Sequence, residues 1–177
     1  MPRGAGSLTL TTTLLSVGHD HDFDPLELIE EVAAVHDWPC ERHDDGDIAL
    51  HIVGRSCEYR LWFGWREDMH ALHFSCALDS RVPKARWRAL YPLLAKINER
   101  LWLGHFELWQ DERRPAFRHT LLLARPDSLS ANLIQALIDA AIEECERFYC
   151  AFQFVIWGGK SAEEAIAAAI LDPIGEA

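Results

Sequence analysis

Two histidines and three aspartates crowd into six residues near the start of the chain, within the stretch GHDHDFDP. Imidazole and carboxylate groups at this density could hold a metal ion for an enzyme or a metal sensor. The candidate ligands are His19, His21 and Asp22, with a strand histidine such as His43 or His51 as a further one. No later group of histidines and aspartates follows at a recognisable ligand spacing. The metal site is therefore an alternative to a polar segment that leads into a helix.

The same stretch ends in signals that begin a helix. Asp24 is a good N-cap, Pro25 suits the first helical position, and Glu27 completes a capping box. The sequence DPLELIEEVAAVHDW therefore predicts a helix that Asp24 caps. We expect residues 1–22 to be a flexible leader and residues 23–177 to form a single domain.

A second stretch, WGGKS, resembles a phosphate-binding loop but lacks its first glycine, because Phe154 stands at that position. It also follows a predicted helix, whereas such loops follow a strand. We expect Gly158 and Gly159 to end that helix and Ser161 to cap a short one after it.

Other groups that could do acid–base chemistry have simpler structural interpretations. Glu143, Glu144 and Glu146 fall on one predicted helix, and we expect them on its solvent-exposed side. His70 and His73 lie three apart in a predicted strand, so their side chains would point to opposite faces. No G-x-S-x-G or H-E-x-x-H motif occurs. We therefore expect no catalytic residues and no cofactor.

Cysteine content and charge narrow the function classes further. The chain has five cysteines, an odd number, and no C-x-x-C pair. This pattern argues against a disulfide framework and against a structural zinc site. Free cysteines fit a reducing cytoplasm. The net charge of -11 and the absence of a basic cluster argue against nucleic acid or an anionic membrane as partner. A protein partner remains open.

The elements that must position any site follow from periodicity. Three strands are predicted at residues 47–54, 57–66 and 69–79. A helix is predicted at residues 83–102, which Pro92 should kink or divide and Gly104 should stop. Two more strands are predicted to form a hairpin at residues 105–124. A long helix follows at about 130–157. The pattern predicts an α+β fold, an antiparallel five-stranded sheet with helices on one face, in the order α-β-β-β-α-β-β-α plus a short C-terminal helix.

Two tryptophans stand out of phase with this sheet. Trp62 falls on the polar side of its strand, and Trp109 alternates against Phe106 and Leu108. Large aromatic side chains on the face away from the core are candidates for an interface. Trp62 and Trp109 are therefore the candidate partner-binding residues, although a second covered face of the sheet would also bury them.

The C-terminal half resembles the YbjN family of bacterial sensory transduction regulators, and most resembles its alphaproteobacterial branch. The residues that carry the resemblance are Asn98, Gly104, Phe106, Phe117-Arg118, the run from Phe148 to Ser161, and the tail Gly175-Glu176-Ala177. The resemblance extends more loosely over residues 23 to 177.

This resemblance implies a fold similar to that of type III secretion chaperones. Such chaperone-like domains are typically cytoplasmic and dimeric and bind polypeptide segments, and no catalytic residue carries over from the family. We therefore expect a non-enzymatic, chaperone-like or regulatory module that acts in signalling, motility or stress regulation. We expect it to be a homodimer and to bind an unidentified protein or peptide.

Overall fold

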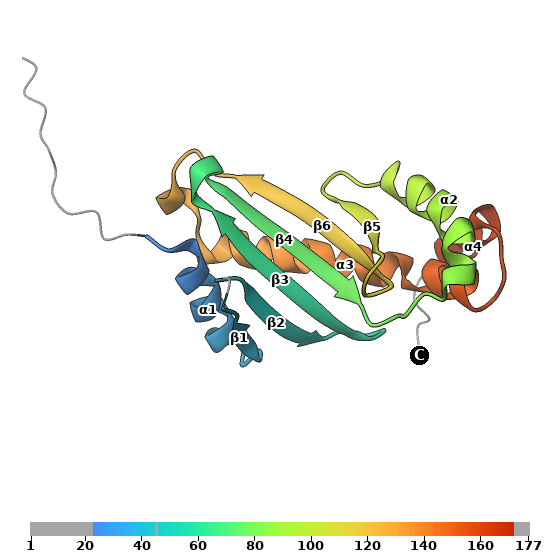
Figure 1. The fold of residues 1–177 in the computed structure, drawn as a ribbon, viewed down its shortest axis with the longest axis horizontal. Helices are drawn as coiled ribbons and strands as arrows, with labels where there is room; N and C mark the ends of the chain where they lie inside the picture. Colours follow the sequence, from blue (N-terminus) through green and yellow to red (C-terminus); the bar gives the residue numbers. More distant parts are fainter. Residues whose placement is uncertain (1–22, 45, 172–177) are drawn as a thin grey trace, which may run out of the picture.

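A six-stranded antiparallel sheet carries the fold (Figure 1). The computed structural model describes residues 23–44 and 46–171. The strand order is β1-β2-β3-β4-β6-β5, so that β4 pairs with β6 and the chain reaches β5 by a crossover. The strands are β1 (Cys40–Arg42), β2 (Ile48–Val53), β3 (Glu58–Arg66), β4 (Ala71–Leu78), β5 (His105–Trp109) and β6 (Arg114–Leu122).

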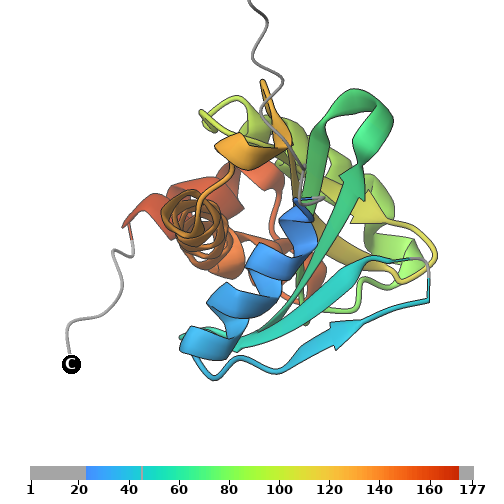
Figure 2. The same cartoon turned by 90° about the vertical axis from the view of Figure 1, so that its left-hand side faces the viewer.

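Four α-helices pack around this sheet. They are α1 (Pro25–Val35), α2 (Trp87–Asn98), α3 (Ala131–Ile156) and α4 (Ala162–Leu171). Helices α1 and α3 lie on the same side of the sheet (Figure 2). Helix α2 contacts β5, α3 and α4 at the opposite end of the molecule from α1 (Figure 1).

The expected α+β architecture is confirmed, but the expected five strands are wrong because there are six. The missed strand is β1, whose three residues are all exposed. It forms by backbone pairing with β2, where Cys40 lies opposite Leu50 and Arg42 opposite Ile48. A strand this short with no buried side chain has no period-2 pattern to find.

The helix ends agree closely with their sequence signals. Asp24 accepts a hydrogen bond from the Leu26 amide at 2.9 Å and caps α1, and Ser130 caps α3. Gly159 has a φ of +67°, the left-handed conformation that ends helices, and Ser161 with Glu164 forms the expected capping box of α4. The helical interpretation of WGGKS is therefore confirmed.

Helix α2 differs from its prediction in two ways. It continues through Pro92 as one helix, so of the two expected effects of proline the division is wrong and the kink stays a prediction. Four apolar side chains of α2 are buried in the core and hold the helix together: Leu90, Leu93, Leu94 and Ile97. The helix also ends at Asn98, before Gly104, and the Asn98 side chain binds the backbone of β5.

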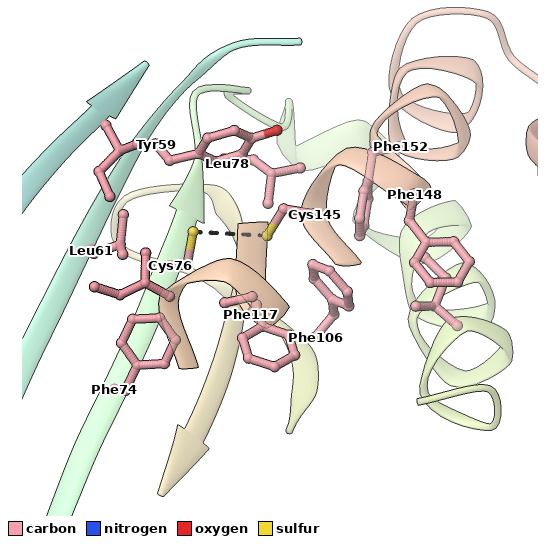
Figure 3. Close-up of a cluster of buried hydrophobic side chains, with 14 of the residues drawn as sticks. Tyr59, Leu61, Phe74, Cys76, Leu78, Phe106, Phe117, Cys145, Phe148 and Phe152 are labelled. Atoms are coloured by element: carbon pink, nitrogen blue, oxygen red, sulfur yellow. Dashed lines mark hydrogen bonds between the residues drawn. The ribbon is translucent and has the colours of Figure 1, made fainter. Parts of the chain in front are cut away.

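The core lies between the sheet and α3 (Figure 3). The buried side chains of β3 alternate along the strand, as its sequence predicts. In β4 the expected apolar side chains are buried, but Ser75 and Ala77 on the opposite face are buried as well, so the expected half-exposed pattern of β4 is wrong. Phe148 and Phe152 of α3 pack against Phe106 of β5, with ring centroids 6.2 and 5.3 Å apart. The thiols of Cys76 and Cys145 meet in the same layer at 3.8 Å. This packing leaves the other face of the sheet without α1 or α3 over it.

Candidate functional site

The candidate site is the sheet face opposite α1 and α3, which we call the open face. It carries the alternate residues of the strands, among them Arg60, Trp62, His73, Glu107 and Arg118. Trp62 lies between Ala49 of β2 and Ser75 of β4 in the register of the sheet. Both tryptophans predicted from the sequence are on this face.

The structure brings Trp62 and Trp109 together. Their ring centroids are 5.1 Å apart, at a tilt of 56°. Strands β4 and β6 lie between β3 and β5, and three inter-strand steps span roughly 14 Å. The two rings can therefore meet only if both lean across the strands between them.

Small side chains make this contact feasible. Ala77 and Ala116 are 2% and 0% exposed although neither faces α1 or α3. Such small side chains on β4 and β6 leave room for the two indoles to meet above these strands. Both indoles remain half-buried rather than fully packed. An apolar platform is thus left partly open to solvent in the middle of a polar face.

Polar neighbours hold each indole in place. Trp109 donates its Nε1–H to Oε1 of Glu107 at 2.7 Å, and Arg118 approaches the same oxygen at 3.6 Å. The guanidinium of Arg60 lies 5.5 Å from the centre of the Trp62 ring and donates to Nε2 of His51 at 3.2 Å. Because both rings are positioned in advance, a ligand would lose little side-chain entropy in using them.

The histidines of the strands and turns in the described part of the chain lie apart from one another or have other neighbours. His73 contacts Oγ1 of Thr120 through Nδ1 at 3.3 Å, and burial together with nearby Arg118 lowers the pKa of His73. His70 lies in the turn before β4, with a φ of +47°, and its ring stacks on Trp65. Within 23–44 and 46–171, no group of three histidine, cysteine or acidic residues is placed to hold a metal ion. His19, His21 and Asp22, the alternative metal ligands, lie outside the described residues.

One buried carboxylate was not anticipated. Glu146 was expected on the solvent-exposed side of its helix, but it is 9% exposed and that expectation is wrong. It accepts hydrogen bonds from the amides of Arg55 and Ser56 at 2.7 and 3.1 Å and from the Ser56 hydroxyl. Burial raises the pKa of Glu146, but these hydrogen bonds outweigh it and leave the pKa below its usual range. The residue fastens the β2–β3 turn to α3.

The sequence matches the model of one protein family. The model of the YbjN family, described as a proposed bacterial sensory transduction regulator, matches residues 25–154. The chain belongs to the YbjN family. This match covers α1 through most of α3 and confirms the resemblance read from the sequence, whereas the alphaproteobacterial branch stays a prediction. The match ends before Gly158 to Ser161 and α4, so it does not reach the tail.

Two solved structures share the fold. One is a chain of the crystal structure of the ExsC–ExsE complex, at 14% identity and a TM-score of 0.52, covering 68% of this chain and 86% of the other. The second is YbjN from E. coli, described as a proposed transcription regulator, at 10% identity and a TM-score of 0.50, covering 83% and 93%. No curated protein is similar in sequence. At these identities the likeness concerns the fold alone.

A membrane-spanning role finds no support in the helices. None of those in the described part of the chain is long and apolar enough to cross a bilayer.

Proposed function

We propose that this chain is a non-enzymatic, chaperone-like regulatory module that binds a polypeptide partner on the open face of its sheet. The observation that carries the proposal is the Trp62–Trp109 platform, a preformed apolar surface among polar side chains. Aromatic residues of this kind dominate the binding energy of protein interfaces. Membership of a regulator family, and a shared fold with a chain of a two-protein complex, support it.

The edges of the sheet favour binding across the face rather than strand addition. At the β5 edge, Asn98 donates to the Phe106 carbonyl at 3.0 Å and accepts from the Phe106 amide at 2.7 Å. Its side chain thus occupies the backbone groups that an added strand would need. At the other edge, β1 is only three residues long. Neither edge offers a long unpaired strand, so the partner is expected to lie across the open face.

The same proposal includes the cellular setting expected for such a module. The protein acts in the cytoplasm as a homodimer and serves signalling, motility or stress regulation through its partner. The free cysteines of the described chain and its acidic composition support a reducing, soluble setting. A sedimentation-equilibrium mass of one chain, rather than two, would remove the homodimer from the proposal.

The test is partner capture followed by binding with purified proteins. The tagged protein is used to capture candidate partners from a cytoplasmic extract of the cells that produce it. Each purified candidate is then titrated calorimetrically against the wild type and against Trp62→Ala/Trp109→Ala. We expect the double variant to bind at least about 30-fold more weakly, since hot-spot aromatics contribute about 2 kcal/mol or more. Trp62→Phe/Trp109→Phe, which keeps apolar rings on the face, should lose less.

The matched control replaces two tryptophans outside the sheet. Trp102 and Trp157 are 98% and 59% exposed. We expect Trp102→Ala/Trp157→Ala to bind the partner like the wild type. A partner that binds the Trp62→Ala/Trp109→Ala variant with unchanged affinity would show that the open face is not the site.

A further inference from the structure

A hollow of about 290 Å³ opens on the open face beside the aromatic platform. Trp62 forms one of its walls and Ala77 lies in its lining, so part of the surface is apolar. Three carboxylates from different segments also line it: Glu58 at the start of β3, Asp79 just after β4, and Glu112 in the turn between β5 and β6. The hollow therefore combines an apolar surface with acidic groups.

Of the two arginines that line the hollow, one pairs with a carboxylate and the other contacts a histidine and an aromatic ring. Arg114 pairs with Asp79 at 2.6 Å between Nη1 and Oδ1. Arg60 is held between His51 and the ring of Trp62. In contrast, Glu58 and Glu112 are exposed and form no ion pair within 4.0 Å with any residue of the described chain. Three carboxylates and two arginines line the hollow, so its formal charge is -1, and among the lining groups without an ion pair Glu58 and Glu112 outnumber Arg60.

We propose that this hollow receives an arginine or lysine side chain from an extended partner segment. The inference rests on the proposed function, because it specifies what the partner presents at the same face. The aliphatic part of the basic side chain packs on Trp62 and Ala77, and its charged end meets Glu58 and Glu112. Side chains two positions apart in an extended segment point the same way, so a neighbouring apolar residue can rest on the Trp62–Trp109 pair.

Charge complementarity favours this occupant over an acidic one. An acidic side chain would bring a further negative charge beside Glu58 and Glu112, against the single arginine of the hollow, Arg60, that forms no ion pair. The net charge of -11 also attracts basic segments over a longer range. An acidic ligand is therefore an outcome that the test must be able to show.

The test selects peptides from a phage-displayed library of random linear sequences. Selections are run in parallel on the wild type, Glu58→Gln/Glu112→Gln and Trp62→Ala/Trp109→Ala. The control, Glu31→Gln/Glu143→Gln, removes the same amount of charge from exposed residues of α1 and α3, on the other side of the sheet. Enriched peptides are synthesised, and their affinity is measured at low and at moderate ionic strength.

We expect wild-type peptides to share a basic residue two positions from an apolar one. Their affinity should fall about tenfold in Glu58→Gln/Glu112→Gln, as expected for two partly exposed ion pairs, and should weaken with salt. The Glu31→Gln/Glu143→Gln control should bind like the wild type.

The outcomes that overturn the inference differ from those that overturn the proposed function. The basic anchor would be refuted, and polypeptide binding left intact, by peptides whose binding depends on Trp62 and Trp109 and which meet one of three conditions. Such peptides would lack a basic residue, carry an acidic residue instead, or bind Glu58→Gln/Glu112→Gln as tightly as the wild type. Failure to enrich any peptide, or binding that is insensitive to Trp62→Ala/Trp109→Ala, would refute both.

Discussion

At the scale of single residues, Glu146 shows how a distant contact can reverse a local pattern. Its neighbours Glu143 and Glu144 are exposed or half-exposed, as a helix surface predicts. Glu146 instead turns inward to bind a turn 90 residues earlier in the chain. Gly54 makes room for it, because a Cβ there would lie 2.6 Å from Oε1 of Glu146 and 2.3 Å from the Tyr59 ring.

We predict that Glu146→Gln lowers the free energy of unfolding by about 1–3 kcal/mol near pH 7, because it leaves turn amides poorly paired. The pKa of Glu146 is lower in the folded than in the unfolded state. Its contribution is therefore full above the usual glutamate pKa of about 4.3 and is lost as pH falls through the folded-state value. Urea unfolding between about pH 7 and about pH 3 should show the difference from wild type shrinking.

The control for this prediction is Glu143→Gln, which changes an exposed neighbour on the same helix. It should stay within about 0.5 kcal/mol of wild type at every pH. A Glu146→Gln deficit that is the same at acid and neutral pH would contradict the assigned ionised state.

The cysteines differ in reactivity because they differ in burial. Cys76 and Cys145 are both 0% exposed, and burial raises the pKa of Cys145. Cys40 and Cys150 are exposed. Burial should protect both inner thiols by excluding the reagent, and because the thiolate is the reactive form, the raised pKa of Cys145 should protect that thiol further.

We predict that iodoacetamide near pH 8 labels Cys40 and Cys150 in the folded protein and leaves Cys76 and Cys145 unlabelled. Peptide mapping by mass spectrometry reads each site separately. All five cysteines should react once urea unfolds the chain. Labelling of Cys145 at the rate of Cys150 under native conditions would mean that α3 separates readily from the sheet.

At the scale of elements, the junction of α2 with β5 protects one edge of the sheet. Asn98 satisfies both outward-facing backbone groups of Phe106, and Tyr91 approaches Gln110 at 3.3 Å further along. Gly104 allows the chain to turn into β5, with a φ of +62° and the Phe117 ring 2.4 Å from where a Cβ would lie. Helix and strand are thus joined by side-chain-to-backbone bonds instead of a strand pair.

We predict that Asn98→Ala costs about 1–3 kcal/mol of stability, because the amide and carbonyl of Phe106 lose their partner in a part-buried position. Hydrogen exchange of the Phe106 amide should accelerate relative to β3 and β4. Gln110→Ala, at the exposed end of the same junction, should change stability by less than about 0.5 kcal/mol. Equal effects of the two substitutions would show that Asn98 has no special role.

At the scale of the whole molecule, the fold presents one packed face and one open face. The core side chains run from Leu26 to Ile166, so the described elements supply the apolar burial between α3 and the sheet. The net charge of -11 disfavours non-specific self-association of such a molecule through charge repulsion.

We predict that a chain of residues 23–177 folds with an unfolding free energy within about 0.5 kcal/mol of the full chain, since the core begins at Leu26. Urea unfolding followed by circular dichroism measures this. A larger loss would mean that residues 1–22 pack on the fold. The shortened chain should also bind the same partner, which keeps the open-face proposal independent of those residues.

The sequence by itself determined the features that depend on residues a few positions apart. Asp24 and Ser161 cap helices where their local patterns predicted, and the alternation in β3 assigned its buried side chains correctly. Capping and strand alternation are local because each involves backbone groups or faces within about one turn or one pleat. The same alternation showed that Trp62 and Trp109 face away from the core.

Only the tertiary structure decided which distant segments meet. The β4–β6 pairing brings Trp62 and Trp109 into contact across two strands, and β1 exists only because β2 is there to pair with it. Glu146 is buried because the β2–β3 turn presents two amides to α3. These contacts join residues tens of positions apart, and their free energy comes from packing and pairing that no local pattern encodes.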